Sequence, residues 1–271
     1  MTILDKIVRH KMTEVEQRKA LFPVKLLEKS LFYTTPAVSL KKYLLREDKS
    51  GIIAEFKRRS PSQGDINPFA KVEQVTIGYM QAGASALSVL TDEHFFGGSS
   101  DDLKEARKFN FCPILRKDFV IDPYQIFEAR SIGADVILLI AECLDAKQIN
   151  VLAGLAKSLG LEVLLEVHSA DQLAKLCPEI DVVGVNNRNL KDFSVSIQTS
   201  INLFDQIPSD FIKISESGIN DPNVIVELRQ VGFQGFLIGE NFMKTPDPAK
   251  ACRQFIERIK HIEDMLENAI A

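Results

Sequence analysis

The chain has 271 residues, of which 45% are hydrophobic and 26% charged, and its formal net charge is −4. This length and composition fit one large α/β core, and the absence of a basic stripe with interleaved aromatic residues argues against nucleic-acid binding. No stretch of the sequence approaches the ~18 apolar residues of a membrane span, so no membrane insertion is predicted. The four widely spaced cysteines indicate reduced thiols in a cytoplasmic protein, with neither a disulfide framework nor a zinc site.

Residues 1–50 are predicted to form a helical extension. Helical apolar spacing runs from Thr2 to Leu21 and from Val24 to Leu31, and Ser39 can cap a third helix that ends near Leu45. The apolar face of this segment consists of Ile3, Ile7, Leu21, Leu26 and Leu27. We expect it to pack on the rest of the chain, covering one end and closing over a ligand, and a partner protein is the alternative.

Residues 51–271 are predicted to form a single (β/α)8 TIM barrel. Eight apolar runs alternate with helical stretches, and the last helix extends from Pro248 to about Leu266. The runs are Ile52 to Lys57, Ala86 to Thr91, Pro113 to Lys117, Val136 to Ile140, Glu162 to Val167, Val182 to Asn186, Phe211 to Ser215 and Gly235 to Ile238. Eight such units approach the ~250 residues of a typical barrel. An open doubly wound sheet is the structural alternative.

Three helix-to-strand junctions share a glycine, at Gly83, Gly133 and Gly232. A glycine after the last helical residue is the usual left-handed cap, so these positions mark where helices end and strands follow. Ordinary capping explains any one of them, but the repetition favours a barrel of repeated units.

Polar residues follow nearly every apolar run. They are Glu55 and Lys57, then Arg116 to Asp118, Glu166 and His168, Asn186 to Arg188, Ser215 to Gly218, and Gly239 with Glu240. Because barrel enzymes carry their chemistry at the C-terminal ends of the strands, these residues are predicted to share one rim. Structural ion pairing is the alternative for Lys117 and Glu166. We assign His168 to a hydrogen-bonded position outside the catalytic set.

Two glycine turns indicate a phosphate site. One begins at Ser217-Gly218 and precedes a helix that Asn220 or Asp221 can cap, and the other contains Gly239. Backbone N–H groups at such turns form the phosphate site usual after strands 7 and 8 of these barrels. Lys57 and Ser60 are predicted to face this site across the rim, whereas Arg58 and Arg59 are left without a substrate role, as in a solvated charge run.

Lysines and carboxylates without a metal cluster suit acid–base chemistry on a phosphorylated small molecule. A lysine can protonate a carbonyl oxygen, and a carboxylate can move a proton to or from carbon. A sugar-phosphate isomerase, or a Schiff-base aldolase that uses Lys117, fits the same pattern. A non-catalytic ligand-binding protein is disfavoured, because the acid, base and phosphate positions are all filled.

The strand-end motifs resemble the indole-3-glycerol phosphate synthase family. The motifs, in chain order from Gly51 to about Met243, are IIAEFKRRSPSQGDI, SVLTDEHFFGGS, PILRKDFVID, LLEVH, VGVNNRNL, ISESGI and GFLIGENFM. The resemblance implies a (β/α)8 enzyme that closes the pyrrole ring of 1-(2-carboxyphenylamino)-1-deoxyribulose 5-phosphate, with loss of carbon dioxide and water. It also implies that no cofactor or metal takes part. A monomer is the default expectation.

The resemblance also implies residue roles. Lys117 would be the general acid on the ribulose carbonyl, Glu166 the carboxylate for the later dehydration, and Lys57 an anion contact that shares the acid role, with Glu55 positioning the lysines. Asn186 and Ser217 would complete the catalytic set; Ser60, Arg188 and Glu216 would orient the substrate; Phe96, Phe119 and Leu138 would line its aromatic ring; and Gly218 and Gly239 would hold the phosphate. Glu240 departs from the expected small hydroxyl residue, so its side chain is predicted to point away and only its backbone N–H to bind phosphate.

Overall fold

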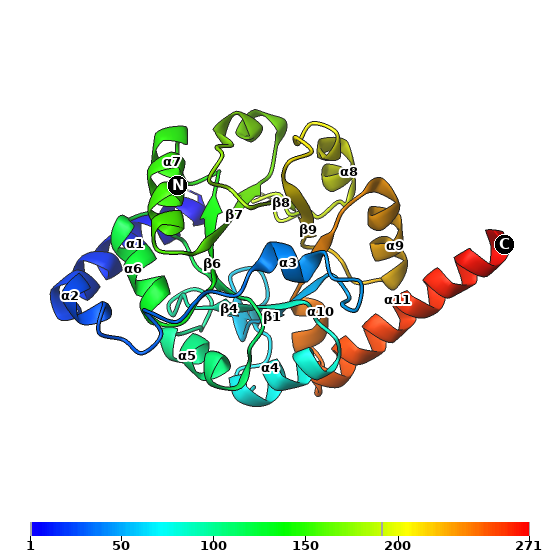
Figure 1. The fold of residues 1–271 in the computed structure, drawn as a ribbon, viewed down its shortest axis with the longest axis horizontal. Coiled ribbons are helices and arrows are strands. Elements are labelled where there is room, and N and C mark those ends of the chain that lie inside the picture. Colours follow the sequence, from blue (N-terminus) through cyan, green and yellow to red (C-terminus); the bar gives the residue numbers. More distant parts are fainter. Residues whose placement is uncertain (1, 191, 271) are drawn as a thin grey trace.

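In the computed structural model, which describes residues 2–190 and 192–270, parallel strands close into a barrel (Figure 1). The neighbours around the barrel are β1, β10, β9, β8, β7, β6, β5 and β4, and β4 pairs with β1 to complete it. The barrel strands are β1 (Ile52–Phe56), β4 (Ala86–Leu90), β5 (Ile114–Lys117), β6 (Val136–Ile140), β7 (Glu162–Val167), β8 (Val182–Asn186), β9 (Ile212–Glu216) and β10 (Gly235–Ile238). The predicted (β/α)8 barrel is confirmed, and the open sheet is excluded.

Helices surround this barrel (Figure 1). Those that follow strands are α4 (Val72–Gln81), α5 (Ser100–Phe109), α6 (Pro123–Ser131), α7 (Ala146–Ser158), α8 (Gln198–Phe204), α9 (Pro222–Val231), α10 (Glu240–Met243) and α11 (Pro248–Ile270). After β7 the chain forms a 3-10 helix, η1 (Ala170–Lys175), instead of the predicted α-helix. Pro178 disfavours helical backbone at Cys177, which leaves too little chain for a longer helix before β8.

The predicted glycine caps are confirmed. Gly232 ends α9 with a φ of 119°, a left-handed conformation in which a side chain would be strained. Gly83 and Gly133 adopt the same region at the corresponding junctions. Each therefore turns the chain from a helix directly into the next strand.

The barrel interior is apolar at its base. Alternate strand residues point inward, so Ile53, Leu115 and Ile214 pack together inside the barrel. Leu40 and Leu44 of α3 (Leu40–Leu44) join this cluster and close the N-terminal end of the strands. The same alternation carries inward-facing positions upward to the C-terminal ends of the strands, where the polar residues begin.

The N-terminal helices α1 (Ile3–Leu21) and α2 (Val24–Leu27) bury fewer of their apolar side chains than predicted. Ile7, Lys11 and Val15 form the buried stripe of α1, whereas Leu21 and Leu26 are 69% and 49% exposed. The predicted burial of these two leucines is wrong, because the last residue of α1 and the side chains of α2 lie outside the buried stripe. The end of α1 is instead tied to α6 by the Tyr124 hydroxyl, which donates to the carbonyl oxygens of Arg18 and Phe22.

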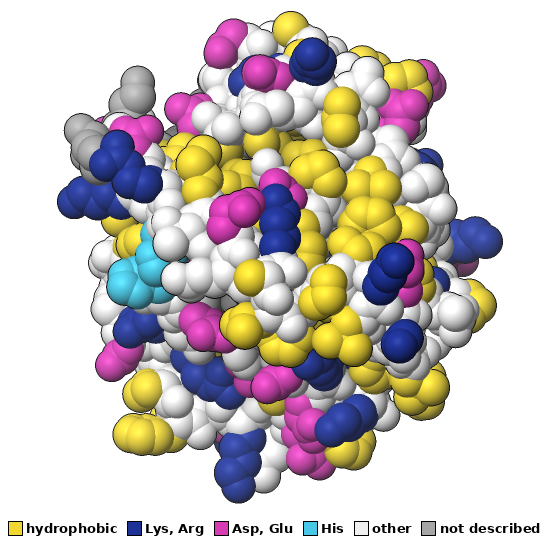
Figure 2. Space-filling model, turned by 90° about the vertical axis from the view of Figure 1, so that its left-hand side faces the viewer, with side chains coloured by type: hydrophobic (Ala, Val, Ile, Leu, Met, Phe, Trp, Pro, Cys, Tyr) yellow, Lys and Arg dark blue, Asp and Glu magenta, His cyan; other side chains and the backbone are white. Residues whose placement is uncertain are grey.

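Figure 2 shows the side of the molecule that carries α1 and α2. Apolar side chains and charges of both signs alternate on this face, and no continuous basic patch appears on it. The described residues include no helix that is both long enough and apolar enough to span a membrane. A short hairpin of β2 (Arg59–Ser60) and β3 (Gly64–Asp65) follows β1 and was not predicted.

Candidate active site

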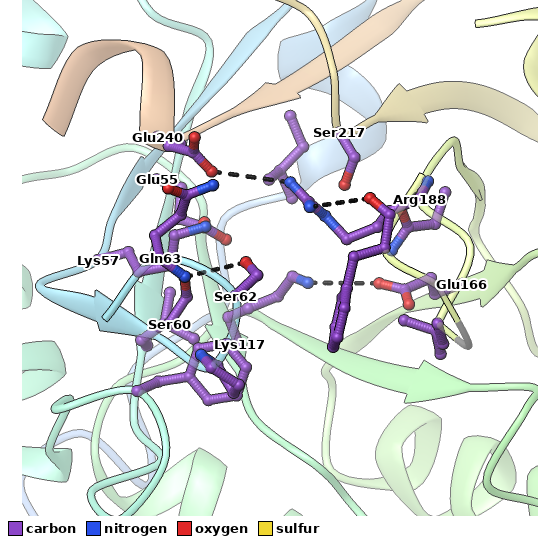
Figure 3. A pocket seen from close by; sticks show the side chains of 18 of the residues that line it. Glu55, Lys57, Ser60, Ser62, Gln63, Lys117, Glu166, Arg188, Ser217 and Glu240 are labelled. Atoms are coloured by element: carbon purple, nitrogen blue, oxygen red, sulfur yellow. Dashed lines mark hydrogen bonds and ion pairs between the residues drawn. The ribbon is translucent and has the colours of Figure 1, made fainter. Parts of the chain in front are cut away.

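A cavity of about 550 Å³ opens at the C-terminal ends of the barrel strands. This volume lies in the range of small-molecule sites. Its lining includes the predicted residues Glu55, Lys57, Ser60, Phe96, Lys117, Phe119, Leu138, Glu166, Asn186, Arg188, Ser217, Gly218, Gly239 and Glu240. The remaining predicted residue, Glu216, lies beneath the cavity and is 1% exposed. Each of the eight barrel strands, or the segment that follows it, therefore contributes a residue to one place, and Figure 3 labels ten of the lining residues.

Lys117 lies at the floor of the cavity, at the last position of β5. Its ammonium is 3.3 Å from Glu166 Oε2 and 3.8 Å from Glu216 Oε2. Burial alone would lower the pKa of Lys117, but the carboxylates of Glu166, Glu216 and Glu55 outweigh burial and raise the pKa. Lys117 is therefore a protonated ammonium that points at the cavity, as a general acid requires.

Glu55 and Lys57 form the opposite wall, two residues apart on the inward face that begins with Ile53. Their charged groups are 2.9 Å apart. Burial acts to raise the pKa of Glu55, but Lys57 and then Lys117 overcome it, so Glu55 stays ionised. A Cβ at Gly239 would lie 2.5 Å from Glu55 Oε1, so the glycine makes room for this carboxylate.

Glu216 ends β9 and stands behind Lys117. Burial, reinforced by the nearby charge of Glu166, raises the pKa of Glu216 to about 8. Its Oε1 has no hydrogen-bond partner among the described residues, and a Cβ at Gly184 would lie 2.2 Å from that oxygen. Glu216 therefore keeps its proton to a higher pH than an ordinary glutamate, and its side chain fills the space that a strand glycine leaves.

His168 contacts the site, although we assigned it to a hydrogen-bonded position outside the catalytic set. Its Nε2 lies 3.4 Å from Glu166 Oε1, just after β7 ends at Val167. Neither ring nitrogen has a hydrogen-bond partner within the described part of the chain. The expectation of a hydrogen-bonded histidine is wrong, because the ring approaches Glu166 without making a hydrogen bond.

The turn after β9 has an unusual backbone. Ser217 adopts a φ of 68° and Gly218 a φ of 73°, and left-handed conformation in a non-glycine residue is a form of strain associated with functional sites. The Asn187 side chain holds the turn by donating to the Ser217 carbonyl oxygen at 3.1 Å. Of the two predicted caps, Asp221 is the one that caps α9, by accepting from the Asn223 N–H.

Glu240 is the first residue of α10, directly after Gly239. Its carboxylate does not turn away as predicted, because Oε2 lies 3.7 Å from Arg188 Nη2, and both residues line the cavity (Figure 3). Arg188 follows β8 and supplies the opposite charge that draws the carboxylate inward.

The basic turn after β1 separates as expected into two parts. Lys57 and Ser60 line the cavity. Arg58 pairs with Asp102 at 2.6 Å, and Arg59 donates to the carbonyl oxygens of Glu93 and His94. The two arginines are thus bound to the neighbouring segments, and the solvated charge run considered from the sequence is wrong for this turn.

Apolar walls complete the cavity. The rings of Phe96 and Phe119 lie 5.8 Å apart on one side. Ile3 and Ile7, on the apolar face that was expected to close over a ligand, line the cavity together with Leu4. The sequence did not assign to the site several other lining residues, namely Leu190, Phe193 and Val195 after β8 and Lys244 after α10. Of these two groups, only the residues of α1 carried a usable signal, in their helical apolar spacing.

Few side chains in the described part of the chain are suited to binding a metal ion or to reacting as thiolates. No three His, Cys, Asp or Glu side chains within residues 2–190 and 192–270 are arranged to hold a metal ion. The four cysteines are free, and burial raises the pKa of Cys112, Cys143 and Cys252 to about 12. The polar atoms of the cavity are thus mainly ammonium, guanidinium, carboxylate, amide and hydroxyl groups.

Sequence comparison places residues 4–255 in one family model, described as indole-3-glycerol phosphate synthase. A curated indole-3-glycerol phosphate synthase from Bacteroides thetaiotaomicron is 48% identical over 258 residues, which are 95% of this chain and 99% of the relative. One from Polaromonas sp. is 42% identical over 256 residues, which are 93% of this chain and 97% of the relative.

Structure comparison finds other barrels. The crystal structure of 3-hexulose-6-phosphate synthase from Salmonella typhimurium matches with a TM-score of 0.62, covering 78% of this chain and 99% of that one. At 13% sequence identity, this likeness shows the fold alone.

Proposed function

This chain belongs to the indole-3-glycerol phosphate synthase family, and we propose that the rim cavity carries out the family reaction with Lys117 as general acid and Glu166 as proton-transfer carboxylate. The enzyme is a carboxy-lyase of tryptophan biosynthesis that acts on a phosphorylated small molecule. The observation that carries the proposed roles is the Lys117 ammonium, held by Glu166 and Glu216 at the cavity floor.

The first chemical step joins the ring carbon that bears the carboxylate to the ribulose carbonyl carbon. As this bond forms, the carbonyl oxygen takes a proton from the Lys117 ammonium, which the surrounding carboxylates keep charged. Loss of carbon dioxide leaves its bonding electrons in the ring and restores aromaticity. Lys57, 2.9 Å from Glu55, is placed to neutralise an anionic group of the substrate and to share the acid role.

The second step removes water. The new hydroxyl group leaves as water with a proton from Lys57, which shares the acid role, and the ring nitrogen lone pair drives its departure. The Glu166 carboxylate takes the proton that the substrate carbon skeleton then loses, and at 3.3 Å from Lys117 it can pass this proton on to restore the ammonium. The products of the two steps are indole-3-glycerol phosphate, carbon dioxide and water, which balance the substrate.

The remaining predicted residues support orientation. We assign the phosphate to the backbone at Gly218 and Gly239, with the Glu240 N–H beside them, since both turns line the cavity. Asn186, Arg188, Ser217 and Ser60 orient the polar groups, and Phe96, Phe119 and Leu138 contact the aromatic ring. Holding a flexible substrate folded contributes several kcal/mol, up to about 7 to 11. Glu216 acts on the substrate through Lys117, since it lies beneath the cavity.

The division of the chain into two segments, its oligomeric state, its cellular location and its partners are proposals that rest on the sequence. We treat residues 1–50 as an extension that works with the barrel of residues 51–271, since Ile3, Leu4 and Ile7 line the cavity. We also propose a monomer that acts in the cytoplasm without cofactor or metal and without nucleic-acid or membrane partners.

A direct assay tests the proposed function. The carboxyphenylamino substrate in metal-chelated buffer should give rise to indole fluorescence, with little protein background because the chain contains no tryptophan. Lack of product would refute the activity. Borohydride trapping of the substrate on Lys117 would instead indicate a Schiff-base enzyme, which the raised pKa of Lys117 disfavours because such a lysine must lose its proton.

A further inference from the structure

One ion pair joins two loops at the mouth of the cavity. Arg188, two residues after β8, and Glu240, at the start of α10, approach to 3.7 Å between Nη2 and Oε2 (Figure 3). The side chains are 23% and 35% exposed, so water reaches both groups. This pair is longer than the neighbouring 2.9 Å pair of Glu55 and Lys57, and it is the easier of the two to exchange.

The Arg188 backbone is well held. Its N–H donates to Asn186 Oδ1 at 3.0 Å, and Arg188 forms an antiparallel bridge with Val195. Val195 in turn packs against Gly218, where a Cβ would lie 2.2 Å from Val195 Cγ1. The loop thus fixes the start of the arginine side chain beside the proposed phosphate turn, while its long side chain can redirect the guanidinium by rotation.

The Glu240 carboxylate occupies a place where an anion is expected to bind. It follows Gly239 directly, and Gly218 and Gly239 both line the same cavity. A dianionic phosphate bound at these turns would lie near one carboxylate and one guanidinium. The carboxylate repels it, and the guanidinium attracts it only after release from the carboxylate.

We propose that Glu240 is an internal competitor for Arg188, which it occupies in the empty site and releases to the phosphate of the substrate. The inference rests on the proposed function, because it assigns the phosphate to the turns at Gly218 and Gly239. The consequence of this competition is that the site favours the substrate over inorganic phosphate. Inorganic phosphate alone must displace Glu240 without help, whereas the substrate adds the binding energy of its aromatic ring and carboxylate.

The Glu240→Gln variant tests this competition. Inorganic phosphate binding is measured by ³¹P NMR line broadening at fixed ionic strength, and KM is measured by indole fluorescence. Exposed ion pairs contribute about 0.2 to 1 kcal/mol, which corresponds to at most about fivefold in an equilibrium constant. We expect the variant to bind inorganic phosphate about three- to fivefold more tightly, with a smaller decrease in KM.

A matched variant controls for the lost charge. Glu263→Gln also removes a carboxylate from an arginine pair, with Arg229, and that pair has similar exposure, 31% and 30%. Arg229 also donates to the Ser50 carbonyl oxygen, near the N-terminal end of β1 and far from the cavity mouth. Phosphate binding should therefore not change in this variant.

The Arg188→Met background separates competition from direct repulsion. The effect of Glu240→Gln should be clearly smaller there, because the direct repulsion between carboxylate and phosphate remains but no guanidinium is left to be released. Equal tightening in both backgrounds would show direct repulsion and overturn the competition, as would unchanged or weaker phosphate binding in Glu240→Gln alone. The ³¹P measurement needs no turnover, so its outcome is separable from a failure of the proposed activity.

Discussion

Two buried charge clusters lie on either side of β5, and they differ in how their charges are matched. The first, which we call the anchor network, consists of Lys11, Arg18, Arg116, Asp92, Asp118 and Glu128. Lys11 is 1% exposed and lies 2.9 Å from Asp92 and 3.0 Å from Asp118. Arg116 contacts Asp118 and Glu128, and Glu128 also pairs with Arg18. Every carboxylate in this network contacts a cation.

The second cluster is the cavity floor, made of Glu55, Lys57, Lys117, Glu166, Glu216 and His168. Its contacts with Lys117 are longer, at 3.3 and 3.8 Å, and Glu216 must keep a proton to be accommodated. Close, fully matched charges favour one geometry, whereas loosely matched charges leave groups able to gain or lose protons. The comparison suggests that the anchor network supports the fold and that the cavity floor supports the reaction.

Lys117→Met provides the most severe test of this division. Loss of a general acid commonly costs 10²- to 10⁴-fold, so we expect turnover to fall by about that factor while the far-UV circular dichroism spectrum is unchanged. Glu166→Gln should behave similarly. The control is Lys157→Met, which removes a lysine bound to both oxygens of Asp181 at 2.8 Å outside the cavity. Near-normal turnover in Lys117→Met would show that Lys117 is not the general acid.

Lys11→Met should have the opposite profile. It leaves Asp92 and Asp118 buried without their shared cation, which typically costs about 3 to 5 kcal/mol of the free energy of unfolding. Turnover per folded molecule should fall much less than in Lys117→Met. Urea unfolding measures the stability, and Lys19→Met on the same helix is the control, because its pairs are exposed and contribute under about 1 kcal/mol. A Lys11→Met protein as stable as wild type would contradict the conclusion that the anchor network supports the fold.

The sequence was sufficient for most of the barrel because short, nearly continuous apolar runs, typical of strands buried on both faces, recur along it. β6, β7, β8 and β10 occupy the predicted ranges. Alternation of side chains along each strand explains why Lys57, Lys117 and Glu166 meet. Lys117 and Glu166 follow the inward residues Leu115 and Leu164 by two positions, and Lys57 follows the inward Ile53 by four. The roles assigned to these residues remain predictions.

Other features depend on contacts between distant segments. Lys11 occupies a helical position between Ile7 and Val15, but a lysine there is normally read as solvent-facing. Only the approach of Asp92 and Asp118 makes its burial possible. Likewise, the inward turn of Glu240 depends on Arg188, and the contact of His168 with Glu166 depends on backbone after the strand end.

The Glu216→Gln variant tests the difference between the two clusters through the pH dependence of protein stability. The folded pKa of Glu216 is about 8, above the usual 4.5, so between these values the folded protein carries a proton that the unfolded chain lacks. Its contribution to stability therefore falls as pH rises through this window, and the full cost appears above pH 8. We expect the variant to match wild type near pH 5 and to exceed its stability by about 1 to 3 kcal/mol at pH 8.5.

The stabilities of wild type and Glu216→Gln are compared through their urea unfolding midpoints from pH 5 to 8.5. Subtracting one from the other at each pH removes the contribution of the ionisable groups that both proteins contain. The anchor network supplies the contrast. Asp118 has a lowered pKa, since Lys11 and Arg116 outweigh burial, so it stays ionised throughout this range. Asp118→Asn should show a stability difference from wild type that does not vary with pH between 5 and 8.5. Parallel curves for wild type and Glu216→Gln would contradict the neutral state of Glu216.

His168→Asn is expected to give the smallest effect. Burial raises the pKa of Glu166, whereas Lys117 and then His168 lower it, and the lowering wins. Removal of the ring leaves Lys117 as the main stabilising charge, so the acid limb of kcat should move to higher pH by less than about one unit. Turnover near pH 7 and KM should change little, because Glu166 stays ionised well above its lowered pKa. His94→Asn, which alters an exposed ring, should leave the pH profile in place. If His168 only fills space, its variant would lower stability without moving the acid limb, and the cavity floor would lose one of its members.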